Sequence, residues 1–398
     1  MVRDIIFCLL IFLMPVTTIA QTWILFNQSN SGLPDNAVKC LAFDNSNVLW
    51  IGTDNGLARF DGTNWNTYNT GNSGIASNQI RSIAFDSLNR LWVGTFNNGA
   101  CSFDGTNWTV FNTQNSSIAS NTIKGISTAP NGDVWFATTN GLSVYNDTLF
   151  TTYNIFNSGL ATNHFTHVAV GLNQLFIGSI NGGFATYDSL FHAYTIVNSG
   201  FPDNTTLSTA LDTNQKAWIA TPSSGLVVYL NPNSWITYNT NNSGMPVNSL
   251  NDLCFDGVGN LWMTSPTQGL ILKNATNFTH YTTQNSALPS NQLHCLFYNQ
   301  GILWIGSTFD GLVKLSFNAG INNHYNNDLL FPNPASQNIM LPSNFDHMRI
   351  TNCFGKVIID APIMSTIVTV ASWPSGVYCC ELTSNNGLRK IYKVVVAH

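Results

Sequence analysis

The segment NSGLPDN (Asn30–Asn36) decides the fold because six similar segments follow it along the chain. The later copies begin at Asn72, Asn115, Asn157, Asn198, Asn242 and Asn285. Successive copies are separated by 42, 43, 42, 41, 44 and 43 residues. Self-similarity at a fixed period of this size is the signature of a repeat architecture. The chain is therefore built largely from seven consecutive units of one kind.

Each unit contains the same order of short apolar segments. In the first unit AVKCLAF (Ala37–Phe43) is followed by LWIGT (Leu49–Thr53), GLARFDG (Gly56–Gly62) and WNTYNT (Trp65–Thr70). Short strands separated by Gly, Asn and Asp turns are typical of all-β proteins. Four strands in a unit of this length match a propeller blade. We predict an all-β fold with a seven-bladed β-propeller.

The two ends of the repeat region indicate how the ring closes. The region begins with a lone strand at Trp23–Phe26, and the last unit stops after its third strand, GLVKLSF (Gly311–Phe317). The N-terminal strand is therefore predicted to complete the seventh blade and to remove the open sheet edges. A solenoid of stacked strands is the rival fold, but it needs polar end caps.

The repeat pattern resembles a known family. An inner strand, a turn, LWIGT and GLxxFDG are similar to the two-component-regulator propeller repeat, over about residues 23–318. That resemblance implies blades like those of the periplasmic sensor halves of bacterial hybrid histidine kinases, or of free-standing secreted proteins.

The last seventy residues have a different pattern. PNP (Pro332–Pro334), a Gly-Lys pair at Gly355, WPSGVY (Trp373–Tyr378) and KIYKVVV (Lys390–Val396) follow one another there. Alternating strands joined by Gly and Pro turns predict a small C-terminal β-sandwich. The four elements resemble the type A sorting domain of the Bacteroidetes type IX secretion system, which implies that the type IX machinery is a partner. The alternative is an accessory β-sandwich with a binding role of its own.

The N-terminus predicts export. Arg3, the apolar run Ile5–Leu13 and the small residues before Gln21 form a secretory signal. The predicted parts are a signal peptide (1–20), the propeller (21–318), an Asn-rich linker (319–328) and the sorting β-sandwich (329–398). No other apolar run approaches the roughly 18 residues of a spanning helix, so we expect no transmembrane segment in the mature chain. We expect a secreted or outer-surface protein that reaches the periplasm through its signal peptide.

Composition argues against several functions. Only 8% of the residues are charged and the net charge is −5, which gives no reason to expect nucleic acid as a partner. The cysteines left after the signal show no CxxC pair, so we expect no metal, cofactor or disulfide framework. Glycosidases need paired carboxylates, but Glu381 is the one glutamate of the chain. Aspartates in strand-end turns, which have a structural explanation, include Asp44, Asp61, Asp86 and Asp104. We predict no catalytic residues.

One set of positions stands out as a candidate site. Three residues beyond the last Asn of each turn lie Lys39, Arg81, Lys124, Thr166, Leu207, Asn251 and His294. Sevenfold pseudosymmetry places them at one height on the inner strands, near the mouth of the central channel. Three of the eight Lys and Arg residues of the propeller occupy this set in consecutive blades.

These cations predict a basic arc that binds an anionic or sugar ligand. The candidate ligand-binding residues are Lys39, Arg81, Lys124, Asn251 and His294, with Asp54 and Asp310 in loops of the same face. Asp35 is the acid nearest to Lys39 in sequence and a candidate partner for it. The structural alternative is that long side chains extend from a crowded inner strand to solvent.

The sequence favours a binding or interaction propeller for a glycan or for another surface protein. The alternatives are a polysaccharide-degrading enzyme, such as a lyase that uses a His and a Tyr, and an adhesin or structural surface protein. Function depends on the site and not on the propeller scaffold, so the fold alone does not decide among them.

Overall fold

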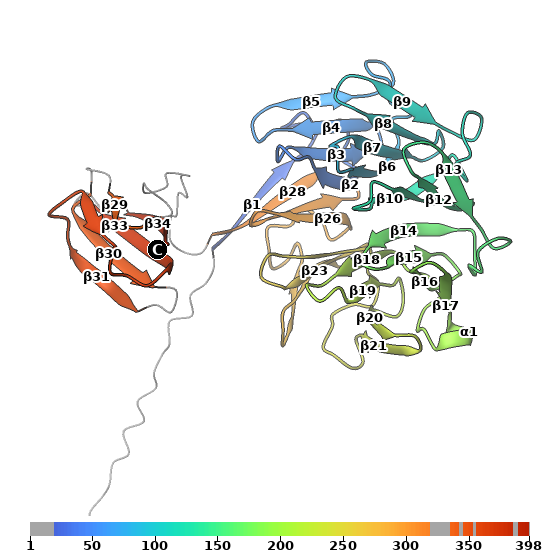
Figure 1. The fold of residues 1–398 in the computed structure, drawn as a ribbon. Coiled ribbons are helices and arrows are strands. Elements are labelled where there is room, and N and C mark those ends of the chain that lie inside the picture. The colour runs from blue at the N-terminus through green and yellow to red at the C-terminus, as the bar shows by residue number, and fades with distance from the viewer. Residues whose placement is uncertain (1–19, 319–334, 342–344, 353–355, 385–388, 398) are drawn as a thin grey trace, which may run out of the picture. The chain divides into compact units, whose positions relative to one another are not determined.

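The computed structural model describes residues 20–318, 335–341, 345–352, 356–384 and 389–397. Residues 22–316 form one compact unit, and the chain from Phe317 onward belongs to a second (Figure 1). The predicted signal peptide, apart from its last residue, and the predicted linker lie outside the described residues.

The first unit consists of seven four-stranded antiparallel sheets, one for each repeat, counted over the described residues. Blade 1 contains β2 (Val38–Phe43), β3 (Leu49–Thr53), β4 (Gly56–Phe60) and β5 (Trp65–Tyr68). Blade 2 contains β6 (Ile80–Phe85), β7 (Leu91–Thr95), β8 (Ala100–Phe103) and β9 (Trp108–Phe111). Blade 3 contains β10 (Ile123–Thr128), β11 (Val134–Thr138), β12 (Gly141–Tyr145) and β13 (Phe150–Tyr153). Blade 4 contains β14 (Phe165–Val170), β15 (Leu175–Ser179), β16 (Phe184–Tyr187) and β17 (Phe191–Tyr194).

The remaining blades follow the same order. Blade 5 contains β18 (Ser208–Leu211), β19 (Ala217–Ala220), β20 (Leu226–Asn231) and β21 (Ser234–Tyr238). Blade 6 contains β22 (Asp252–Phe255), β23 (Leu261–Ser265), β24 (Gly269–Lys273) and β25 (Phe278–Tyr281). Blade 7 contains β26 (Leu293–Asn299), β27 (Ile302–Ser307) and β28 (Leu312–Asn318), and β1 (Ala20–Phe26) lies beside β28 as its fourth strand.

The seven sheets form a ring around a central channel. The first strand of each blade contacts the first strand of the next, and β26 of blade 7 contacts β2 of blade 1 (Figure 1). The fold is therefore the predicted all-β, seven-bladed propeller.

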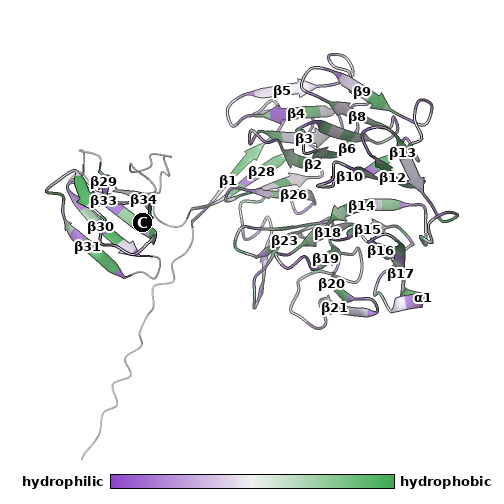
Figure 2. Cartoon of the chain, in the orientation of Figure 1, coloured by the Kyte–Doolittle hydropathy of each residue, from purple (hydrophilic) through white to green (hydrophobic). Residues whose placement is uncertain are grey.

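Apolar residues on both faces of the middle strands hold neighbouring blades together, and Figure 2 shows hydrophobic stretches along the strands. Every residue of β3 is buried, and Trp50 lies against Tyr68 of its own blade and Phe85 of the next. Gly52 allows this close approach, because a Cβ atom there would lie 2.6 Å from Cγ2 of Ile80. Burial of these faces is the main stabilising contribution to the ring.

One connection between blades contains the single described helix, α1 (Ile196–Ser199). The side chain of Thr195 accepts a hydrogen bond from the backbone N–H of Asn198, and Gly200 ends the turn with φ of 68°. This is a one-turn variant of the repeated Asn-Ser turn, so it does not change the repeat.

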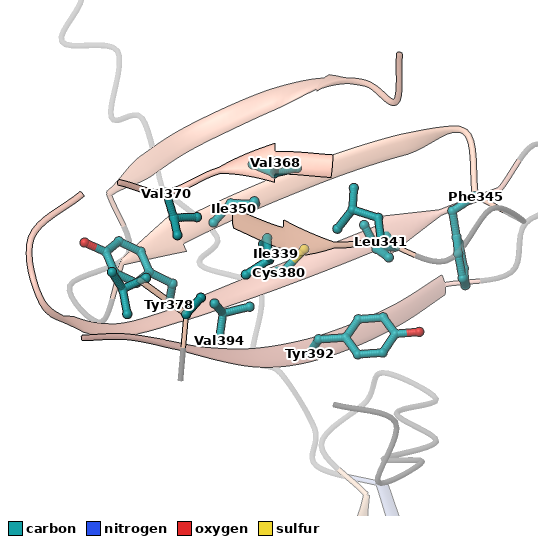
Figure 3. Close-up of a cluster of buried hydrophobic side chains, with 13 residues drawn as sticks. Ile339, Leu341, Phe345, Ile350, Val368, Val370, Tyr378, Cys380, Tyr392 and Val394 are labelled. Atoms are coloured by element: carbon teal, nitrogen blue, oxygen red, sulfur yellow. The ribbon is translucent and has the colours of Figure 1, made fainter. Parts of the chain in front are cut away.

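The second unit is a small β-sandwich. Its larger sheet has the order β31 (Val357–Pro362), β30 (His347–Asn352), β33 (Gly376–Thr383) and β34 (Arg389–Val396), and its smaller sheet pairs β29 (Asn338–Met340) with β32 (Ile367–Thr369). Figure 3 shows the core that both sheets share, with Ile339 and Val368 from one sheet and Ile350, Cys380 and Val394 from the other.

Candidate functional site

The candidate site lies at the entrance of the propeller channel. In blades 1, 2, 3, 4 and 7 the register of the first strand shifts at the predicted position, which places each residue in a β-bulge. Bulges redirect a side chain out of the regular alternation of a strand. A cavity of about 390 Å³ is lined by all seven predicted positions, Lys39, Arg81, Lys124, Thr166, Leu207, Asn251 and His294. The structure therefore brings together the residues that pseudosymmetry predicted to be adjacent.

Asp54 connects two of the three cations. Its carboxylate lies 3.2 Å from Lys39 Nζ and 2.5 Å from Arg81 Nη1. Burial raises the pKa of Asp54, but the hydrogen bond and charge of Arg81, together with Lys39, outweigh burial and keep the pKa below its usual value. Asp54 is therefore ionised at neutral pH and neutralises one of the two positive charges.

Asp35 does not have the role suggested by its place in the sequence. Its carboxylate accepts the backbone N–H of Ala37 at 2.7 Å, which closes the local turn. The acid that pairs with Lys39 comes instead from the loop after β3, because the bulge directs Lys39 toward that loop.

Lys124 has a different environment. Within the described part of the chain it has no ion-pair partner, and its Nζ lies 5.8 Å from the ring centre of Phe96. The Arg81 guanidinium carbon lies 4.9 Å from the same ring. Burial, and then the charge of Arg81, lower the pKa of Lys124. Two cations thus lie near one aromatic ring, and among the described residues Asp54 forms ion pairs with Lys39 and Arg81 but not with Lys124.

Two histidines lie near the cations. His294 lines the cavity, and burial followed by the charges of Lys39 and Arg81 lowers its pKa to about 4. His164 has a lowered pKa because of burial and the charge of Lys124. Its Nε2 is buried without a hydrogen-bond partner among the described residues. Both rings are neutral at pH 7, so they add polar atoms to the site but no charge.

Asn251 and Asp310 differ in their relation to the cavity. The Asn251 side chain lines the cavity, but its Nδ2 donates to the Leu293 carbonyl at 2.9 Å and so links blades 6 and 7. Asp310 is absent from the residues that line the cavity, and its backbone N–H donates to Ser307 Oγ at 2.6 Å. Both remain on the ring, but neither joins the cationic cluster.

The sequence did not predict that Phe96 lies beside the cations or that Asp54 pairs with two of them. Each occupies the position directly after the LWIGT-type strand, in blade 2 and in blade 1. Aligning this position across the repeats gives Asp54, Phe96, Thr139, Ile180, Pro222, Pro266 and Thr308. This position holds a carboxylate in blade 1 and an aromatic ring in blade 2, the blades that also carry Lys39 and Arg81. That difference between the repeats is the signal that could have identified both residues.

The Asn-Ser turns have a structural role. In every copy the turn asparagine donates its side-chain N–H to the backbone carbonyl five residues earlier, as Asn30 does to Leu25 and Asn72 to Thr67. The strand-end aspartates behave similarly, because Asp61 and Asp104 each accept two backbone N–H groups of their own turns. Such bonds fix turns and leave these groups less available to a ligand.

Among the described residues no group of three or more His, Cys, Asp or Glu side chains is arranged to hold a metal ion. The described residues also contain no helix that is both long and apolar enough to cross a membrane.

Two parts of the chain match known families. Residues 329–397 match the secretion system C-terminal sorting domain, and residues 32–55 and 74–97 match the two component regulator propeller. No curated protein matches the chain. The two family matches agree with the resemblances noted in the sequence. The sorting domain indicates export to the cell surface or secretion.

Solved structures with a similar fold include extracellular and cell-surface proteins of bacteria. The extracellular domain of BT3049 of B. thetaiotaomicron, described as a hybrid two component system, has a TM-score of 0.64 at 18% identity and covers 94% of this chain and 57% of its own. PorZ of Porphyromonas gingivalis, described as an essential surface component of the type-IX secretion system, has a TM-score of 0.57 at 16% identity and covers 94% and 61%. This chain thus spans less than two thirds of either protein.

Enzymes are also among the solved structures with a similar fold. Virginiamycin B lyase of Staphylococcus aureus has a TM-score of 0.59 at 14% identity and covers 75% of this chain and 100% of its own. At such identities the similarity concerns the fold and not the activity.

Proposed function

We propose that this exported surface propeller is a binding protein that captures an acidic glycan at the mouth of its channel. The observation that carries the proposal is the cluster of Lys39, Arg81 and Lys124 at a cavity of about 390 Å³, with Asp54 as their acidic partner. The carboxylates nearby are Asp54, which pairs with two of the cations, and Asp252 of the cavity wall, which accepts hydrogen bonds from Ser208 Oγ and the Leu296 N–H. The three cations therefore outnumber the nearby carboxylates in a chain of net charge −5. An anionic ligand is the chemistry that complements such a cluster.

The geometry supports recognition of carboxylate or sulfate groups on a sugar. The volume lies within the range of small-ligand sites. Arg81 and Lys124 both place their charged groups near Phe96, which is 42% exposed and offers an apolar surface to a sugar ring. Asn251 and Thr166 add polar groups to the wall. An acidic patch on a surface protein is the alternative partner for the same cations.

A second candidate is a lyase that acts on an acidic polysaccharide. His294 is neutral at pH 7, with its pKa lowered to about 4, and lies in the same cavity as Lys39 and Arg81. In such a reaction a base takes the proton from the carbon beside a carboxylate, a C=C bond forms as the bond to the glycosidic oxygen breaks, and water gives that oxygen its proton, so that an unsaturated sugar and a free hydroxyl form. His294 would be the base and the cations would bind the carboxylate.

A binding and turnover experiment separates these functions. The full chain is titrated by calorimetry with polygalacturonate, chondroitin sulfate and neutral dextran, and each mixture is monitored for the ultraviolet absorbance of unsaturated sugars. We expect an acidic polymer to bind the parent, the Lys39→Gln, Arg81→Gln, Lys124→Gln triple variant to lose that binding while any binding of dextran is unchanged, and no absorbance change. Formation of unsaturated product would identify a lyase, whereas no binding of either acidic polymer, or binding that the triple variant keeps, would contradict an acidic-glycan site.

A further inference from the structure

A repeated hydrogen bond links an aspartate and a tryptophan in four blades. The indole N–H of the second-strand tryptophan donates to an aspartate that directly follows the first strand. The pairs are Trp50 and Asp44 at 3.2 Å, Trp92 and Asp86 at 3.0 Å, Trp218 and Asp212 at 3.1 Å, and Trp262 and Asp256 at 3.2 Å. This bond gives the indole donor of each of these four tryptophans an acceptor within its own blade.

Blades 3, 4 and 7 depart from this pattern, with Ala129, Gly171 and Asn299 in place of the aspartate. The backbone is kept, because the N–H of Ala129 donates to the Asp133 carbonyl as that of Asp44 donates to Val48. Blade 3 retains its tryptophan, Trp135, whose indole N–H has no acceptor among the described residues. The carboxylate is therefore missing while the donor that it serves is still present.

Cavities occupy the place of the missing carboxylates. A cavity of about 490 Å³ is lined by Ala129, Trp135 and Gly171, and one of about 340 Å³ by Gly171 and Phe176. A third, of about 540 Å³, lies along the outer strand of blade 4 and reaches blade 5. All three share the lining residues Gln174 and Asp188, so they are adjacent to one another. We call these three adjacent cavities the blade 4 groove.

Aromatic rings with protonated hydroxyls line the groove. Burial and the neighbouring Tyr187 hydroxyl raise the pKa of Tyr153, and the two rings lie 6.2 Å apart. Burial and the Tyr194 hydroxyl likewise raise the pKa of Tyr229, and those rings lie 5.8 Å apart. At neutral pH these phenols therefore donate and accept hydrogen bonds without carrying charge.

The polar residues of the groove exclude an anionic ligand. Asp133 and Asp188 are carboxylates on its wall, and no described lining residue is Lys or Arg. Gln174 supplies an amide where the cavities meet, and Leu172, which is 75% exposed, supplies apolar surface. The groove thus combines ring faces, amides, carboxylates and an unpaired indole donor.

From these contacts we infer that the blade 4 groove binds a neutral oligosaccharide chain. Sugar rings present C–H faces to aromatic side chains and hydroxyl groups to amides, phenols and carboxylates. A sugar hydroxyl supplies the acceptor that the Trp135 indole lacks in place of the aspartate. This site is separate from the channel mouth in both position and charge, so it does not depend on the acidic-glycan proposal.

A substitution that restores the pattern of the other blades tests the inference. In Ala129→Asp the new carboxylate caps Trp135 and fills the groove, and Asp188→Ala removes a polar group where the cavities meet. The matched control Asn45→Asp adds the same charge to an exposed turn of blade 1. Calorimetry of the full chain uses cellohexaose, xylohexaose and mannohexaose as probes.

We expect at least one neutral hexasaccharide to bind the parent, Ala129→Asp to lose about tenfold or more in affinity, and Asp188→Ala to lose several-fold. Asn45→Asp and the Lys39→Gln, Arg81→Gln, Lys124→Gln triple variant should bind like the parent, while the melting temperature of Ala129→Asp stays level or rises. Absence of binding by all three probes, or unchanged affinity of Ala129→Asp, would overturn the inference. So would binding of extended peptides in place of the sugars.

Discussion

Polar side chains on the inner strands link neighbouring blades near the channel. Asp252 accepts hydrogen bonds from Ser208 Oγ of blade 5 at 2.6 Å and from the backbone N–H of Leu296 in blade 7 at 2.9 Å. Ser82 accepts the backbone N–H of Ile126 in the same way between blades 2 and 3. Because these groups are buried, each bond is costly to break without a replacement.

The contact between His167 Nε2 in blade 4 and Thr209 Oγ1 in blade 5 depends on pH. His167 lies partly buried, within hydrogen-bond distance of Thr166 and Thr209, and burial lowers its pKa from 6.5 to about 4. The folded state disfavours the charged ring. The contribution of neutral His167 to the unfolding free energy is therefore fully present above the unfolded pKa of 6.5, and it is lost as the pH falls toward 4. The full difference corresponds to roughly 3 kcal/mol for this group.

We therefore expect His167→Gln to flatten the fall in unfolding free energy between pH 6.5 and 4. Denaturant unfolding at several pH values measures this change. Because the pKa of His294 is lowered to the same range, the contribution of His167 is taken as the difference between the slopes of the parent and the variant. His192→Gln, at an exposed ring, should keep the parental slope, and an equally steep fall in His167→Gln would show that His167 is not the group responsible.

Strand β1 is the element whose contribution is least evident from local sequence. It lies beside β28, and its Phe26 packs on Phe60, Trp65 and Trp304 at ring distances of 5.4, 5.7 and 6.1 Å. Its removal would expose the backbone edge of β28 and the faces of these rings. An exposed edge favours association with other chains.

We expect deletion of residues 21–26 to reduce the unfolding free energy by several kcal/mol and to cause self-association. Thermal unfolding and analytical ultracentrifugation measure the two effects. Ile24→Ala is the control, because this side chain is 41% exposed and should have little effect. A deletion variant that stays monomeric with the parental melting temperature would contradict a closing role for β1.

The strands were predictable to within a residue or two, because the same strand pattern recurs in seven copies at a nearly constant spacing. The β-bulges were not, because a bulge depends on how two strands pair and changes no residue type. The salt bridge between Asp54 and Arg81 was missed for a related reason. It joins the loop after β3 to the bulge of β6 in the next blade, 27 residues away, so local turn chemistry favoured Asp35 instead.

The whole molecule combines a propeller and a sorting domain, each with its own core. The Figure 3 cluster belongs to the second unit alone, and the blade interfaces form separate clusters. Among the described residues the two cores have no residue in common. Each unit therefore has the apolar burial that independent folding requires.

A chain that ends at Asn318 should therefore keep the melting temperature of the propeller but fail to reach the surface of its native host. Calorimetry of the purified chain and antibody labelling of intact cells measure the two properties. Replacement of residues 329–397 by another sorting domain should restore delivery. Surface labelling of the truncated chain at the parental level would contradict the role assigned to this region.

The channel mouth gathers positive charge in a chain whose net charge is negative. The chain carries 14 basic and 19 acidic residues, and three of its cations meet at one cavity. At physiological salt, interactions beyond about 10 Å are largely screened, so the ligand responds to this cluster more than to the net charge.

The most direct test measures the affinity of the full chain for an acidic polysaccharide, such as polygalacturonate, across a series of salt concentrations. The variants are the Lys39→Gln, Arg81→Gln, Lys124→Gln triple and, as matched control, Arg59→Gln with Lys216→Gln, which removes cations elsewhere on the propeller. The account predicts that the triple variant loses at least about tenfold in affinity and most of the salt dependence, with a nearly unchanged melting temperature, while the control behaves like the parent. Equal affinity and equal salt dependence in the triple variant and the parent would contradict it.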